Sequence, residues 1–155
     1  MTTAIIDGDI VAFKSAAAVS VKEDTLMEFD PVRAKEYVDH MMNEWTKRIN
    51  PNVTLMCFSD PSRKYFRHDL FPDYKGNRGG MERPSALNFT YEYLSEKYTV
   101  VQKPGLEADD LLGILGTQPD INNPVVVSID KDIMTLPTKV YNPDKMRRPV
   151  RINPN

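Results

Sequence analysis

Short, almost continuously apolar runs restrict the fold of this 155-residue chain more than any other feature of its sequence. Three of them, at residues 4–6, 54–58 and 125–129, read AII, TLMCF and VVVSI. Runs of this kind are typical of strands that are buried on both faces, as in a parallel sheet. With two shorter segments added, the predicted strands are Ala4–Asp7, Thr54–Ser59, Thr99–Val101, Val125–Ile129 and Lys139–Tyr141.

Helix signals lie between these runs. Asp30 stands in a capping position before Pro31, and apolar residues then recur at helical spacing until Pro51. A second helix is predicted from Ser85 to about Lys97, and a third from about Glu107 to about Gly116. The apolar face of the first helix, which we expect to pack on the sheet, consists of Ala34, Tyr37, Val38, Met41, Met42 and Trp45.

The alternation of strands and helices predicts a single α/β domain over residues 1–155, with a mostly parallel twisted sheet of about five strands flanked by helices. The composition, 41% hydrophobic and 27% charged, is that of a globular domain, and no apolar run approaches the roughly 20 residues that cross a bilayer. Cys57 is the only cysteine, which excludes an internal disulfide and a cysteine zinc cluster. With no secretory leader, we expect a cytoplasmic protein without a membrane partner.

Carboxylates follow the predicted strands. Ligands of parallel sheets bind at the carboxyl ends of the strands, so these acids are expected to meet in one cleft. Such a cluster repels itself unless cations neutralise it, and Mg²⁺ or Mn²⁺ accepts a few carboxylate ligands. Two such ions can promote phosphodiester hydrolysis. The eight acids are Asp7, Asp9, Asp60, Glu107, Asp109, Asp110, Asp130 and Asp132.

Each group of acids has a simpler interpretation when taken alone. Asp7-Gly8 after a strand is compatible with a turn, and Asp130-Lys-Asp132 with a turn and a cap. Acids at Glu107 and Asp110 are favourable at the start of any helix, where they interact with its dipole. These interpretations do not explain why the acids occur at successive strand ends.

Four motifs in one order give the chain a resemblance to a known superfamily. They are IIDGD (5–9), FSDPSRKYFRHDLFPDYKGNR (58–78), PGLEADDLLGIL (104–115) and SIDKDIMTL (128–136). They resemble the 5′ nuclease (flap endonuclease) superfamily, which includes phage 5′–3′ exonucleases and the 5′ nuclease domain of DNA polymerase I. The resemblance extends from residue 4 to about 143 and implies a PIN-like fold.

The resemblance implies roles for the acids and for one basic loop. It assigns the second metal to Asp130 and Asp132, places Asp110 near both sites, and leaves Asp9 as an extra ligand of uncertain role. The residues that it assigns to the first metal are Asp7, Asp60, Glu107 and Asp109. Lys75 and Arg78 match basic residues that approach the scissile phosphate, and beside them Tyr74 offers a face on which a base can stack. Upstream in the same loop, Arg63, Lys64 and Arg67 add positive charge.

The implied activity is metal-dependent hydrolysis of DNA, of exonuclease or flap-endonuclease type, in replication or recombination. It leaves 5′-phosphate and 3′-hydroxyl ends and uses one or two Mg²⁺ or Mn²⁺ ions; an RNA–DNA hybrid is a second candidate substrate. The chain departs from the superfamily after Asp132, where a GD-x-x-DN segment and a helical DNA-binding element are expected. The alternative is therefore a catalytically incomplete binding module, or half of a split nuclease completed by a separate polypeptide.

Two other enzyme classes stay open. A phosphatase of the haloacid dehalogenase type would use Asp7 as nucleophile and Asp9 as acid, with Ser59 on the next strand, but it leaves Asp60 and the YKGNR segment without a role. A PIN-type ribonuclease shares the fold and the metal chemistry, and differs in cleaving RNA.

The charge distribution agrees with a nucleic-acid partner. The net charge of −2 sums 22 acids and 20 basic residues, and 14 acids are left outside the eight predicted site residues. The rest of the chain is therefore positively charged, with Lys145, Arg147, Arg148 and Arg151 near the C-terminus. An acidic cleft within a basic surround suits the binding of cations and phosphates together.

Overall fold

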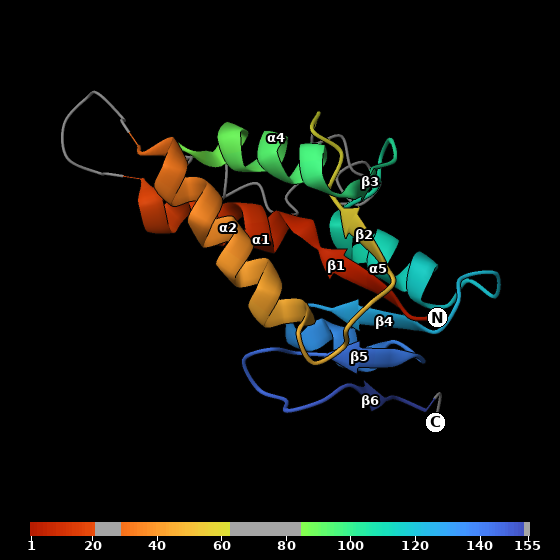
Figure 1. Cartoon of the computed structure of the whole chain (residues 1–155). Helices are drawn as coiled ribbons and strands as arrows, with labels where there is room; N and C mark the ends of the chain where they lie inside the picture. Colours follow the sequence, from red (N-terminus) through yellow and green to blue (C-terminus); the bar gives the residue numbers. More distant parts are fainter. Residues whose placement is uncertain (21–28, 63–84, 154–155) are drawn as a thin grey trace.

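One six-stranded sheet organises residues 1–20, 29–62 and 85–153, the part of the chain that the computed structural model describes. The order is β3-β2-β1-β4-β5-β6 (Figure 1), and only the last pair is antiparallel. This confirms the predicted α/β fold with a mostly parallel sheet. The strands are β1 (Thr3–Asp7), β2 (Val53–Cys57), β3 (Thr99–Val101), β4 (Pro124–Val127), β5 (Lys139–Tyr141) and β6 (Val150–Arg151).

Helices cover both faces of the sheet. On one face, α1, α2 and α4 pack against one another, and on the other α5 packs against β1 and β4 (Figure 1). A 3₁₀ helix, η2 (Lys131–Thr135), follows β4. The α-helices are α1 (Gly8–Val19), α2 (Pro31–Thr46), α4 (Leu87–Lys97) and α5 (Ala108–Gly116).

Alternate residues of the inner strands β1 and β4 pack against the helices on opposite faces of the sheet. In β1, Ala4 and Ile6 pack with the first helix layer, while Ile5 packs with α5. Val126 and its neighbours repeat this division in β4. All of these side chains are almost completely buried, which explains the unbroken apolar runs: no position faces water and so none needs to be polar.

The helix predictions hold with adjusted limits. Asp30 caps α2 as predicted, since its Oδ1 accepts a hydrogen bond of 2.9 Å from the Val32 amide. Tyr37 does not belong to the buried face; it is 39% exposed. The buried residues of α2, Ala34, Val38, Met42 and Trp45, follow a narrower stripe at spacings of four, four and three.

Two elements differ from the sequence-based expectation. The helix α1 begins directly at Gly8, where the Asp-Gly pair is compatible with a turn. The strand β6 has only two residues, too few for a recognisable alternation. Ser59 and Ile129, which we expected to end strands, lie two residues beyond β2 and β4. No helix within the described ranges combines the length and the apolar character needed to cross a membrane.

Candidate functional site

Asp7 is a deeply buried acid at the carboxyl edge of the sheet. It is the last residue of β1, and 2% of its surface is exposed. Its Oδ2 accepts a hydrogen bond of 2.9 Å from the hydroxyl of Ser128, which follows β4, the neighbouring strand. The central strands therefore hold a carboxylate in an environment that disfavours its charge.

The electrostatics of Asp7 show which other acids affect it. Burial first, then the charge of Asp109 and, more weakly, that of Asp9 together raise the pKa of Asp7 from 3.8 to about 7, while the Ser128 hydrogen bond lowers it. Asp109 lies in the first turn of α5, on the opposite side of the sheet from α1. The fold thus brings together two carboxylates from segments about a hundred residues apart, and each disfavours the charge of the other.

Gly8 allows this arrangement because another residue would not fit. A Cβ atom at Gly8 would lie 2.5 Å from the ring of Phe58 and 2.7 Å from the carbonyl oxygen of Cys57. The start of α1 can approach the end of β2 this closely only without a side chain. The Asp-Gly-Asp segment therefore does not form a turn; it is the point where the start of α1 lies in close contact with the end of β2.

Asp9 is held by residues of two other segments. Ser59 donates to it from its hydroxyl and from its amide, the latter at 3.2 and 3.3 Å to the two carboxylate oxygens. The hydroxyl of Tyr91 in α4 donates to Oδ1 at 2.9 Å. The Ser59 hydroxyl also accepts from the amide of Ala108 at 2.9 Å, so this network connects α1, β2, α4 and α5. Such contacts favour a structural role for Asp9 over that of an extra metal ligand.

Asp60 connects β2 with the turn before α5. Its Oδ2 accepts a hydrogen bond of 2.8 Å from the amide of Gly105, and Oδ1 accepts from the amide and the hydroxyl of Ser62 at 3.0 and 2.8 Å. Its own amide donates to the carbonyl of Leu106 at 2.9 Å. Asp60 therefore lies at the predicted edge, next to the segment that carries Glu107.

The acids of α5 divide into two kinds. Glu107 and Asp110 form a capping box, in which the Glu107 amide donates to Asp110 Oδ2 at 3.0 Å and the Glu107 side chain accepts from the Asp110 amide. Both interpretations made from the sequence thus apply here: these acids stabilise the helix start, and they lie at the carboxyl edge. Asp109, between them, is the acid of this helix that acts on Asp7.

Asp130 and Asp132 form the start of η2. Asp130 is the N-cap, and its Oδ1 accepts from the Asp132 amide at 3.0 Å. The Asp130 amide donates to the Ser128 hydroxyl at 3.1 Å, so one serine contacts both Asp7 and Asp130. Asp132 is exposed to solvent. The sequence predicted a turn and a cap as the simpler interpretation of this segment, and the structure contains both.

The structure places all eight predicted acids at the carboxyl edge of the sheet, but not as one compact cluster. In the described ranges, no three His, Cys, Asp or Glu side chains are grouped as a ready metal site. The predicted nucleic-acid-binding residues Arg63, Lys64, Arg67, Tyr74, Lys75 and Arg78 lie outside the described residues. Their roles therefore stay predictions.

Sequence reasoning missed Ser128 and Tyr91. Ser128 is fully buried and is the one polar residue within the apolar run VVVSI, which is a usable signal for a hydrogen-bonding role. Tyr91 gave no such signal, because a tyrosine at helical spacing is equally compatible with packing alone.

Together, the sheet order and the acids that follow its strands define a PIN-like, resolvase-like α/β domain. Residues 2–153 match the family described as 5′-3′ exonuclease, N-terminal resolvase-like domain, and the chain belongs to this family.

Curated relatives and solved structures agree with this assignment. The chain is 30% identical to a 5′-3′ exonuclease of Buchnera aphidicola over 148 residues, which is 89% of this chain and 49% of the relative. It is 24% identical to an exodeoxyribonuclease of Enterobacteria phage T3, covering 86% of this chain and 48% of the relative. The chain thus spans about half the length of these relatives. A structure of the T5 5′-exonuclease with bound zinc ions has a TM-score of 0.65 and 22% identity, over 97% of this chain and 58% of that one.

Proposed function

We propose that this chain carries the catalytic edge of a divalent-metal-dependent 5′–3′ nuclease that hydrolyses phosphodiester bonds of DNA. The observation that carries this proposal is the pair of Asp7 and Asp109 at the carboxyl edge of a 5′-3′ exonuclease-family domain. A buried carboxylate whose pKa is raised to about 7 by burial and a second acid is unfavourable for folding alone. Such groups are concentrated at functional sites.

The residues fit a hard divalent cation. The donors at this edge are carboxylate and hydroxyl oxygens, the ligand type of Mg²⁺ and Mn²⁺, and the repulsion between Asp7 and Asp109 is what a cation offsets. Asp7 and Asp109 would hold the first ion, with Asp60 and Glu107 beside them; Asp130 and Asp132 would hold a second, with Asp110 near both. When bound, the ions supply Lewis acidity and activate water for attack on phosphorus. A structure of the T5 flap endonuclease contains both DNA and metal ions, which supports this choice of substrate and cofactor.

The remaining residues position the reacting groups. Ser128 fixes the orientation of Asp7, and the Asp9–Ser59–Tyr91 contacts hold α1 and α5 at a constant separation. Lys75 and Arg78 are proposed to neutralise charge on the scissile phosphate, and Tyr74 to stack on a base. Hydrolysis is proposed to leave a 5′-phosphate and a 3′-hydroxyl and to take place in a cytoplasm, that of a bacterial host if the chain is phage-encoded.

The test is cleavage of end-labelled duplex, nicked and 5′-flap DNA, and of RNA and RNA–DNA hybrids, with Mg²⁺ or Mn²⁺. We expect cleavage of DNA and at least a hundredfold loss in Asp109→Asn, equivalent to about 3 kcal/mol of transition-state stabilisation. Asp120→Asn is the matched control, since Asp120 is an exposed acid remote from the strand ends. Cleavage that is unchanged in Asp109→Asn would contradict the proposal; preferred cleavage of RNA would favour a PIN-type ribonuclease.

A second candidate is a module that needs a partner chain to complete its second metal site. Two observations favour it: Asp130 is engaged as the cap of η2, and Asp132 is exposed at its first turn. Mixing the chain with a separately produced C-terminal half of a relative would then raise cleavage by orders of magnitude. Cleavage at full rate by the chain alone would contradict this alternative.

A further inference from the structure

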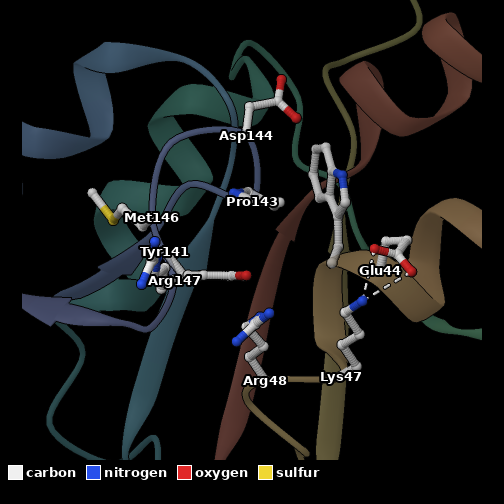
Figure 2. Close-up of a pocket in the computed structure, with 9 residues that line it drawn as sticks. Glu44, Lys47, Arg48, Tyr141, Pro143, Asp144, Met146 and Arg147 are labelled. Atoms are coloured by element: carbon white, nitrogen blue, oxygen red, sulfur yellow. Dashed lines mark hydrogen bonds and ion pairs between the residues drawn. The ribbon is translucent and has the colours of Figure 1, made fainter.

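A second polar hollow lies beside the carboxyl edge, between the end of α2 and the segment that follows β5 (Figure 2). Its volume is about 300 Å³. One wall comes from Trp45, Lys47 and Arg48, and the other from residues of segment 141–147. None of the residues that line it belongs to the eight acids of the candidate site.

The wall formed by segment 142–146 is a hydrogen-bonded turn around Asn142. The side chain of this residue accepts from the Asp144 amide at 3.0 Å, and its carbonyl accepts from the Met146 amide at 2.8 Å. Asn142 is 4% exposed, and its side-chain nitrogen donates to the Ile129 carbonyl at 3.2 Å. The turn is therefore fixed to the residue directly before Asp130, so the hollow adjoins the candidate metal site.

The charges in the hollow are not balanced. Lys47 is paired with Glu44 at 2.9 Å. Arg48 and Arg147 make no ion pair or hydrogen bond within the described part of the chain, although both line the hollow. Among the lining residues, Asp144 opposes them, and Glu44 also attracts Arg48, so that three cationic side chains face two carboxylates. Two guanidinium groups that lack partners can each bind a phosphate oxygen pair.

The floor of the hollow contains aromatic side chains. Trp45 is 4% exposed and Tyr141 is 2% exposed, so both are held by the core where they line the hollow. Because these aromatic side chains are buried, the cations of the hollow are the groups that can contact a nucleic-acid backbone.

We propose that this hollow is a binding site for phosphodiester groups of the nucleic-acid substrate, held by Arg48 and Arg147 beside the carboxyl edge. The proposal rests on the proposed function for the identity of the ligand as nucleic acid. It adds a contact region that lies outside the carboxylates and outside the YKGNR segment.

Trp45 provides the measurement, because it is the only tryptophan of the chain and it lines the hollow. Its fluorescence is followed while a single-stranded oligothymidylate is added in EDTA, so that no cleavage is needed and failure of the proposed nuclease activity is a separate result. We expect a saturable change in emission. Arg48→Gln and Arg147→Gln are each expected to weaken binding about three- to tenfold and to lower the slope of log affinity against log salt by about 0.7.

Matched variants separate a local site from general attraction. Arg148→Gln removes the same charge from an adjacent, exposed position that does not line the hollow, and Arg33→Gln removes it from the other end of α2. Both are expected to change binding less than twofold. Asp144→Asn removes the opposing carboxylate and is expected to strengthen binding about two- to threefold.

Several results would overturn the proposal. Equal weakening by Arg147→Gln and Arg148→Gln would show diffuse attraction only. Saturation by inorganic phosphate as tight as by the oligonucleotide would show a site for a free anion. A fluorescence change that persists unaltered in the Arg48→Gln/Arg147→Gln double variant would place the nucleic acid elsewhere. Because both arginines are exposed, thermal unfolding of each variant should match that of the wild type, so a binding loss reports on the site.

Discussion

Asp7 and Asp130 each follow a parallel strand of the same sheet and share the Ser128 hydroxyl as a partner, yet their environments are opposite. Asp7 is buried, and its pKa is raised to about 7 by burial and by Asp109. Asp130 is partly exposed and stabilises η2 by accepting from the Asp132 amide. A position at a strand end is therefore not enough to define a catalytic acid; depth and the available donors decide whether its charge is tolerated.

This comparison separates an acid that costs stability from one that provides it. In the absence of a cation, the Asp7–Asp109 region stores unfavourable electrostatic free energy, whereas the Asp130 turn contributes a favourable cap. The difference follows from burial and hydrogen bonding. Four experiments on Asp7, Asp130 and Asp132 test this difference.

The largest change in the free energy of unfolding is expected for Asp7→Asn. At pH 8 in EDTA this variant should be more stable than the wild type by about 3–4 kcal/mol, because an amide can accept the Ser128 hydrogen bond without carrying a buried charge. Urea unfolding measures the difference. Asp130→Asn is the control and should be neutral within about 0.5 kcal/mol, since asparagine is an equally good cap. A destabilised Asp7→Asn protein would contradict our account of this acid.

The next effect concerns pH. Because the pKa of Asp7 is raised in the folded state, from 3.8 to about 7, the folded protein binds the proton more tightly than the unfolded chain does. The contribution of Asp7 to stability is therefore fully present below about pH 3.8 and is lost as the pH rises to about 7. Between pH 5 and 6.5, the wild type should lose about 1.4 kcal/mol per pH unit relative to Asp7→Asn. Parallel pH profiles of the two proteins would refute this assignment.

A substitution at the start of η2 is expected to have a smaller effect on the free energy of unfolding, and to lower it where Asp7→Asn raises it. Asp130→Ala removes the acceptor for the Asp132 amide and should lower the free energy of unfolding by about 1 kcal/mol. Thermal and urea unfolding both report it. If the alanine variant were as stable as the asparagine variant, the cap would have no energetic importance.

The smallest effect is expected for Asp132→Asn. This side chain is exposed, and the described contacts at this residue use its backbone, so its replacement should change stability by less than about 0.5 kcal/mol. A larger change in either direction would mean that Asp132 belongs to the same electrostatic group as Asp7.

Local sequence features predicted most of the fold. The inner strands were recognisable because burial on both faces leaves an unbroken apolar run, as in VVVSI, and α2 because Asp30-Pro31 starts it. The helix α1 was not predicted. Its first residue, Gly8, is required by the ring of Phe58, which is fifty positions away in the sequence, so no local pattern indicates why a glycine stands there. The strand β6 was not predicted, because two residues are too few to show an alternation of apolar and polar side chains.

The candidate site shows the same limit. The order of the motifs predicted which acids lie at the carboxyl edge. It did not predict which of these acids accept hydrogen bonds from other segments. The role of Asp9 depends on Ser59 and Tyr91, which are 50 and 82 residues away. The hollow beside the edge likewise joins Arg48 with Arg147, and no local pattern connects them. Such pairs are set by topology, which sequence periodicity does not encode.

Whether Asp7 and Asp109 form a divalent-cation site can be measured by calorimetric titration of Mn²⁺ at pH 8. We expect the site at Asp7 and Asp109 to bind Mn²⁺ strongly in the wild type, to lose at least about tenfold in affinity in Asp109→Asn, and to keep its affinity in Asp132→Asn. Binding of Mn²⁺ to Asp109→Asn with wild-type affinity would contradict the claim.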